Sequence, residues 1–83
     1  MTVTLISLLE EARLNLAAAR ARVIKGKAAC EEFYAHTRPI GPELLKAWQR
    51  EEHSLWIELD EATRFLAKSE HDVRELEEMK ERN

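Results

Sequence analysis

The chain has 83 residues, of which 45% are hydrophobic and 35% charged, with only two glycines and two prolines. This composition is typical of long helices or a coiled coil and excludes a sheet protein or a disordered chain. The formal net charge of −3 is mild, so we expect no nucleic-acid partner. A chain of this length forms one small domain, whose single core is only marginally sufficient for stability.

The apolar run that opens the sequence, Met1–Leu9, is predicted to begin a helix. It carries no early Lys or Arg and is followed by two glutamates, so it is too short for a signal peptide or a membrane span. The helix can begin at Thr2, at Thr4 or at Ser7, where Ser7-Leu8-Leu9-Glu10 matches a capping box. We expect a chain that does not insert into membranes.

Helix-breaking residues occur in one place, Thr37-Arg38-Pro39-Ile40-Gly41-Pro42. Pro39 disfavours the helical conformation in the residue before it, which ends the first helix near His36. Pro42 suits the first position of a new helix, because its missing N–H would have no partner there. The predicted elements of this single domain, residues 1–83, are a helix over about 4–36, a turn at 37–42 and a helix over about 42–80.

Both predicted helices carry a stripe of residues at alternating steps of four and three, which is the seam of a coiled coil. The sequence therefore predicts an all-α, rod-shaped, antiparallel two-helix coiled-coil hairpin. The two stripes are Leu5, Leu9, Ala12, Leu16, Ala19, Val23, Gly26, Cys30 and Phe33, and Leu45, Trp48, Glu52, Leu55, Leu59, Ala62, Leu66, Ser69, Val73 and Leu76.

The position of the turn predicts a register in which facing residue numbers sum to about 78. Small residues then face large ones in several consecutive layers, as dense packing requires. In this register Gly26 faces Glu52, whose carboxylate we expect to reach solvent, Lys25 or Lys27. Other predicted pairs are Cys30/Trp48, Ala19/Leu59, Leu16/Ala62, Ala12/Leu66 and Leu9/Ser69.

Cys30 is the only cysteine, so the chain has no intrachain disulfide and no thiolate metal cluster. Its place in an apolar helical seam predicts a buried, reduced thiol. A reduced thiol is typical of a cytoplasmic protein, and we expect that location.

The seam leaves apolar residues uncovered on both helices, most densely between Leu55 and Leu66. One neighbouring helix cannot cover so wide an apolar surface, and a lone hairpin needs further contacts to be stable. We expect a second interface, formed by homodimerisation into a four-helix bundle or by binding a helix of another protein. Aromatic residues at the centre of a patch are typical hot spots. The candidate protein-interaction residues are Trp56, Ile57, Phe65, Leu14, Ile24 and Tyr34.

The middle of the first helix is basic, and two interpretations of these charges remain open. They could form a solvated face with weak ion pairs to the second helix, such as Arg22/Glu58 and Arg13/Glu70. Alternatively, they form a contact strip for an acidic partner or phosphates. The residues of this candidate strip are Arg13, Arg20, Arg22, Lys25 and Lys27.

The sequence contains no Gly-rich phosphate loop, no HExxH motif, no paired cysteines and no serine elbow. His36, His53 and His71 are too spread along a rod to share a metal, and Glu32 with His36 is interpreted as a surface pair. Glu52 lacks a second acid or base for catalysis. We expect no enzymatic activity, cofactor, metal or small-molecule substrate, although an enzyme dependent on Arg20 or Glu52 remains an alternative.

The segment Pro39-Ile40-Gly41-Pro42-Glu43-Leu44-Leu45-Lys46-Ala47-Trp48-Gln49 resembles the turn of type III secretion needle subunits. Those subunits are helical hairpins of about this length, with Pro-x-x-Pro followed by Leu-Leu, a small residue, an aromatic residue and Gln. Their small co-chaperones are hairpins too. Needle subunits end in an apolar polymerisation tail, whereas this chain ends in the charged stretch Glu77–Asn83, so the resemblance implies an accessory hairpin more than a filament subunit.

The function predicted from the sequence is stoichiometric binding by a self-associating, non-enzymatic module that acts as an adaptor, a chaperone-like protein or a small inhibitor. Its expected partners are a second copy of the chain and another protein. A needle-type subunit or co-chaperone, and a phage or mobile-element inhibitor of a host protein, remain alternatives.

Overall fold

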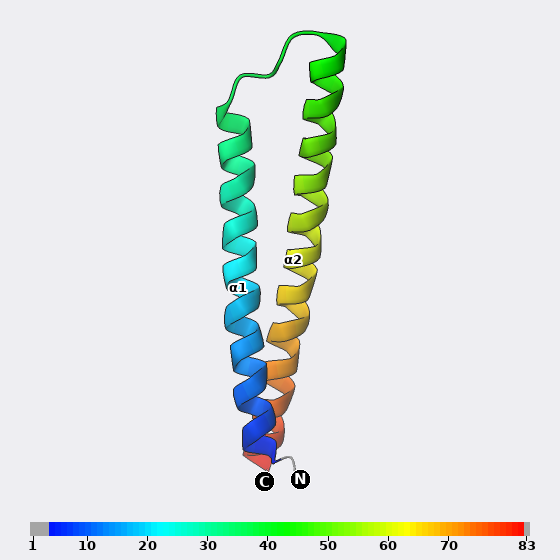
Figure 1. Ribbon diagram of the computed structural model, residues 1–83. Helices are drawn as coiled ribbons and strands as arrows, with labels where there is room; N and C mark the ends of the chain where they lie inside the picture. The colour runs from blue at the N-terminus through cyan, green and yellow to red at the C-terminus, as the bar shows by residue number, and fades with distance from the viewer. Residues whose placement is uncertain (1–3, 83) are drawn as a thin grey trace.

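The computed structural model of this chain describes residues 4–82 as two antiparallel helices, α1 (Leu5–Ala35) and α2 (Pro42–Arg82), joined by a short linker (Figure 1). The molecule is a rod of 63 × 22 × 17 Å. Its radius of gyration of 18.8 Å is well above the roughly 12 Å of a compact domain of this length. The predicted all-α hairpin is confirmed. Within residues 4–82, neither helix has a stretch long and apolar enough to cross a membrane.

Helix α1 begins at a side-chain cap. The hydroxyl of Thr4 accepts a hydrogen bond from the backbone N–H of Ser7 at 3.1 Å, which satisfies one of the free donors of the first turn. Thr4 is therefore the N-cap, while Thr2 lies outside the described residues. The helix ends at Ala35, and the extended residue His36 donates its N–H to the carbonyl of Phe33.

The linker ends at a residue whose backbone conformation favours glycine. Gly41 has φ of +117°, a conformation that side chains with a Cβ rarely adopt. Its carbonyl accepts the first hydrogen bond of α2, from the N–H of Leu45 at 2.9 Å. Pro42 then takes the first helical position, and Glu43 places a negative charge in the first turn, where the helix dipole favours it.

The predicted seam is confirmed position by position. Every seam residue is buried or half-buried, whereas almost every other described residue is exposed. Cys30 is buried and carries a free thiol, as predicted. The buried residues, each at most 9% exposed, are Leu9, Ala12, Ala19, Val23, Cys30, Ala62, Ser69 and Val73.

The predicted register is wrong by one heptad. Gly26 lies against Leu59 rather than Glu52, so close that a Cβ at position 26 would stand 3.2 Å from Cδ1 of Leu59. Near the termini, Ala12 packs in one cluster with Val73. Facing residue numbers therefore sum to about 85.

One of the two predicted ion pairs across the seam shows the same shift. The guanidinium of Arg13 lies 3.4 Å from a carboxylate oxygen of Glu77, one heptad beyond the predicted partner Glu70. The predicted pair of Arg22 with Glu58 is confirmed, with 2.8 Å between Nε and Oε1.

The linker explains the shift, because it runs along α2 instead of reversing the chain sharply. In Figure 1 the first turns of α2 project beyond the end of α1, and the linker climbs from one helix end to the other. Trp48, predicted opposite Cys30, instead stacks on Phe33 with 4.9 Å between ring centroids. Arg38 of the linker lies 5.5 Å above the same indole ring. Prolines favour extended backbone around them, so the linker spans this stagger.

The shifted register keeps the alternation of small and large residues, because both stripes repeat every seven residues. It brings Gly26 to a leucine rather than to a carboxylate, which would lose hydration in the seam without a partner. The layers that follow from this register are Ala12/Val73, Leu16/Ser69, Ala19/Leu66, Val23/Ala62 and Gly26/Leu59.

The close contact at Gly26 gives a test of the register. Overpacking by Gly26→Leu should cost about 1–3 kcal/mol of stability. Replacing a glycine within a helix contributes roughly 1 kcal/mol in the opposite direction, and we expect the overpacking cost to be the larger of the two. Leu59→Ala in the same chain should recover most of the loss, because it vacates the space. Urea unfolding followed by circular dichroism at fixed protein concentration measures both changes.

Ala67→Leu, at an exposed position of α2, is the matched control and should change stability by less than about 0.5 kcal/mol. Recovery by Glu52→Ala in place of Leu59→Ala would contradict the observed register.

Candidate functional site

Helix α1 carries a second line of apolar residues on the side away from α2. These residues follow steps of three and four, like the seam, but are centred about 150° around the helix from it. All of them are exposed, with 71% of the surface of Leu14 and 68% of that of Ile24 accessible. We call Leu14, Ala17, Ala21, Ile24 and Ala28 the outer stripe.

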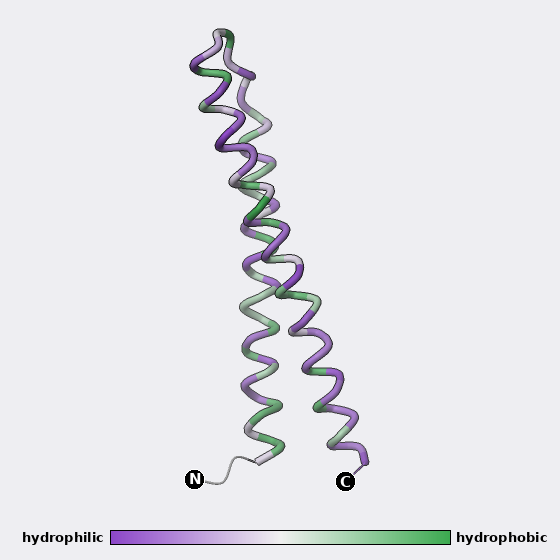
Figure 2. Tube along the Cα trace, turned by 90° about the vertical axis from the view of Figure 1, so that its right-hand side faces the viewer, coloured by the Kyte–Doolittle hydropathy of each residue, from purple (hydrophilic) through white to green (hydrophobic). Residues whose placement is uncertain are grey.

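Helix α2 has no such second face. Its outward positions opposite the seam are mostly charged or polar, which makes it an ordinary amphipathic helix. In Figure 2 the N-terminal half of α1 is largely pale or green, whereas the C-terminal half of α2 is mostly purple. A helix that is apolar on two faces packs against two neighbours. Only one neighbour, α2, is supplied by the described chain.

A row of basic residues borders the outer stripe on one edge. Arg13, Arg20 and Lys27 recur at intervals of seven, which places them on one side of α1 between the seam and the outer stripe. We call these three residues the basic rail. Arg13 is paired with Glu77, whereas Arg20 and Lys27 form no ion pair within 4 Å to any residue in the range 4–82.

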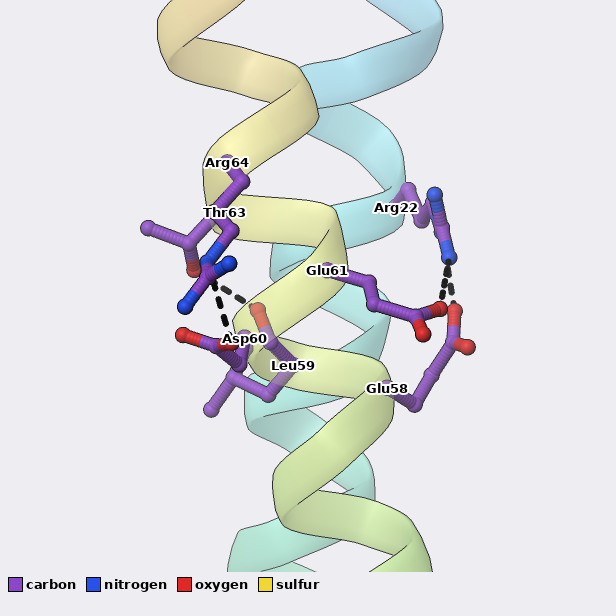
Figure 3. A network of polar contacts seen from close by, with 7 residues as sticks. All are labelled: Arg22, Glu58, Leu59, Asp60, Glu61, Thr63 and Arg64. Carbon is purple, nitrogen blue, oxygen red and sulfur yellow. Dashed lines mark hydrogen bonds and ion pairs between the residues drawn. The ribbon is translucent and has the colours of Figure 1, made fainter.

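The other two residues of the predicted basic strip, Arg22 and Lys25, lie on the opposite edge of α1. Figure 3 shows the guanidinium of Arg22 between Glu58, at 2.8 Å, and Glu61, at 3.7 Å. The hydrogen bond to Glu58 raises the pKa of Arg22, and the same bond lowers the pKa of Glu58. Arg22 therefore ties α1 to α2, so the predicted strip is two separate edges rather than one surface.

The ion pair of Arg64 with Asp60 belongs to a different part of α2. Their nitrogen and oxygen lie 3.1 Å apart within one turn, away from Arg22 in Figure 3. Thr63 bonds back to the carbonyl of Leu59 at 2.8 Å. These contacts are local to α2 and do not join the two helices.

The three aromatic and aliphatic residues predicted as the centre of a patch do not lie together. Trp56 and Phe65 are nine residues apart, which places them about 180° apart around α2. Phe65 lines a shallow hollow of about 280 Å³ together with Leu8 and Asn15 of α1. Ile57 is exposed at 46%. The structure therefore separates Trp56, Ile57 and Phe65 onto different sides of the rod.

Four of the five aromatic residues gather at the turn end of the rod. Phe33 stacks on Trp48 and contacts Tyr34 edge-on, with 5.3 Å between the centroids of Phe33 and Tyr34. The Tyr34 hydroxyl donates to Glu52 at 2.6 Å and accepts from the indole N–H of Trp56 at 2.8 Å. We call Phe33, Tyr34, Trp48 and Trp56 the turn-end aromatic cluster.

This cluster corrects the expectation for Glu52. Its carboxylate binds Tyr34 rather than reaching past Gly26 or meeting Lys25 or Lys27. The hydrogen bond to Glu52 raises the pKa of the Tyr34 hydroxyl above its ordinary value. Tyr34 and Trp56, both predicted interaction residues, are thus held by each other at one end of the rod.

Groups that could perform chemistry are dispersed. Within residues 4–82 no three His, Cys, Asp or Glu side chains come together as a metal-binding set. His71 forms an exposed pair with Glu75 one turn away, at 3.2 Å. The arrangement offers surfaces for binding, of which the outer stripe is the most continuous.

The sequence contained the signal of the outer stripe, because its residues repeat at three and four along α1. Aromatic residues are the usual signal of an interface, whereas the alanines of the outer stripe are recognised only when the apolar residues of α1 are assigned to faces. The aromatic cluster could not be found from spacing, because the one-heptad stagger brings its residues together.

The single tyrosine makes the turn-end contact measurable. Replacing Glu52 with Gln should lower the pKa of Tyr34 toward its ordinary value, because a neutral amide stabilises the phenol less than a carboxylate does. Absorbance of tyrosinate near 295 nm during an alkaline titration follows this group alone.

Because the folded pKa is raised, the contribution of Tyr34 to stability should be complete at neutral pH and be lost as the pH rises through the folded pKa. Circular dichroism at each pH shows that the hairpin stays folded during the titration. An unchanged tyrosine titration in Glu52→Gln would contradict the contact, while Glu51→Gln on the same helix is the matched control.

No family model, curated protein or solved structure shows a significant match to this chain. The resemblance of Pro39–Gln49 to secretion needle subunits therefore stays a prediction. What this chain does must be inferred from its own residues and their arrangement.

Proposed function

We propose that this protein is a non-enzymatic interaction module that binds another protein stoichiometrically through the outer face of α1. The observation that carries the proposal is the outer stripe, a coiled-coil-like line of apolar residues that no part of the described hairpin covers. Its repeat matches that of the seam, which already binds one helix. This repeat best supports a function in which a second helix binds to the opposite face of α1.

The energetics support the same function. Burying a Leu or Ile side chain contributes about 1.5–3 kcal/mol, so Leu14 and Ile24 alone offer a substantial gain to a partner. A monomer that leaves a continuous apolar line exposed is also prone to nonspecific association. The seam of this hairpin buries mainly small residues, and among residues 4–82 no large side chain is completely covered. A partner would therefore stabilise the fold as it binds.

A module of this kind acts as an adaptor, a chaperone-like protein or an inhibitor, and the outer stripe serves each of these roles equally. We place it in the cytoplasm, in keeping with the unpaired thiol of Cys30. Homodimerisation into a four-helix bundle is the alternative way to cover the outer stripe, and it predicts a dimer in solution.

The test replaces the two largest residues of the outer stripe, Leu14→Glu and Ile24→Glu, in one chain. Helicity should stay the same, and the unfolding free energy should change by less than about 0.5 kcal/mol, because both side chains are exposed on the side away from the seam. Affinity capture from the cells that naturally produce the protein, followed by mass spectrometry, should recover a partner in fixed ratio with the wild type and lose it with the variant.

Ile40→Glu, on the linker and 94% exposed, is the matched control and should keep the partner. Sedimentation of the purified chain distinguishes binding of another protein from homodimerisation. A wild-type dimer that dissociates in the double variant would assign the outer stripe to self-association. A complex that survives the double variant unchanged would contradict the proposed site.

A further inference from the structure

We infer that the occupant of the outer stripe is one amphipathic helix of another protein, whose own apolar stripe is flanked by acidic residues. This inference rests on the proposed function and specifies the partner. It follows from the shape of the outer stripe, from the charges that border it, and from the poor fit of a second copy of this chain.

The shape of the outer stripe fits a helix. Leu14 to Ala28 covers four steps of three and four residues, about 21 Å along the axis, which is the spacing that a second helix follows in a coiled coil. Ala17 and Ala21 leave room for large side chains of a partner, whereas Leu14 and Ile24 project as knobs. The intrachain seam uses the same alternation, with Gly26 against Leu59.

The charges around the outer stripe favour an acidic partner. Residues 12–30 contain five Lys or Arg and no Asp or Glu. Arg20 stands three residues after Ala17 and four before Ile24, so it borders the outer stripe directly. The acidic residues of α2 engage Arg13 and Arg22 across the seam, which leaves Arg20, Lys25 and Lys27 without an ion pair within 4 Å in the described chain.

A second copy of α1 fits poorly because its charges would repel. In the antiparallel seam of this hairpin, equivalent edges face each other, as Arg13 faces Glu77 and Arg22 faces Glu58. A second antiparallel seam with the same geometry would set the basic rail against its own copy. A parallel arrangement would also bring together two segments with five cations each. Like charges at such distances are destabilising.

The α2 helix of a second copy does not fit either. Its exposed large apolar residues are Leu44, Trp56, Ile57, Phe65 and Met79, and no three of them repeat at three and four. Its acidic C-terminal part does complement the charge of α1, but Val73 and Leu76 there already lie in the seam, and Met79 is a single exposed side chain that forms no stripe. The described chain therefore holds no exposed face that combines an apolar stripe with acidic flanks.

The experiment uses the full chain and two synthetic helical peptides of four heptads. Both carry the same stripe of leucine and alanine, with Glu at every flanking position in one peptide and Lys in the other. Titration of fluorescently labelled peptide, followed by anisotropy at low ionic strength, should show that the acidic peptide binds at least roughly tenfold more tightly. The difference should shrink in about 0.5 M salt, since salt screens exposed charges.

Two variants test whether the basic rail and the outer stripe cause the preference for the acidic peptide. Arg20→Glu with Lys27→Glu should reverse the preference between the peptides while circular dichroism keeps its helical signal. Ala21→Arg should abolish binding of both peptides, because it puts a long charged side chain in the middle of the outer stripe. Ala67→Arg on the exposed side of α2 is the matched control and should leave both affinities unchanged.

Equal affinity for the two peptides would overturn the inference while leaving the proposed function in place, provided that Ala21→Arg still abolishes binding. No binding of the acidic peptide would also overturn it. A wild-type chain that dimerises, and whose dimer is disrupted by Ala21→Arg, would show that the occupant is a second copy and would overturn the inference as well.

Discussion

The packing of small against large residues in the α1–α2 seam is the constraint on which the rest of the molecule depends. Where Gly26 meets Leu59, a Cβ on residue 26 would stand only 3.2 Å from Cδ1 of Leu59, so a slide by a fraction of a heptad would disturb a tightly fitted contact. Both stripes repeat every seven residues, so the allowed registers differ by whole heptads. The linker then selects among them, with Arg38 and Phe33 against Trp48.

The selected register decides which surfaces the hairpin uses internally and which it leaves free. It brings Glu52 and Trp56 to Tyr34, and it brings the carboxylates of α2 to Arg13 and Arg22. These side chains serve the hairpin itself. The outer stripe lies on the far side of α1, where α2 does not reach, and Arg20 and Lys27 of the basic rail border it. Helix α1 has two apolar faces, and α2 covers only one of them. Function is therefore best sought on the other face of α1.

Much of the fold was predictable because it depends on local rules. Proline at positions 39 and 42 ended one helix and began the next, and the steps of three and four identified every seam residue. The candidate site was predictable only in part. Leu14 and Ile24 were recognised as uncovered, but Trp56 and Phe65 were expected to share a patch and lie on opposite sides of α2.

By itself the sequence determined two long helices, an antiparallel coiled-coil seam, a buried unpaired cysteine and an excess of apolar surface outside the seam. Periodicity and turn chemistry are properties of neighbouring residues, so they can be read along the chain. Only the tertiary structure decided the stagger, since two registers one heptad apart both alternate small and large residues. The stagger depends on how far the extended linker travels beside α2, which no repeat in the sequence encodes. Through the stagger the tertiary structure also decided which aromatic and charged residues are engaged within the hairpin.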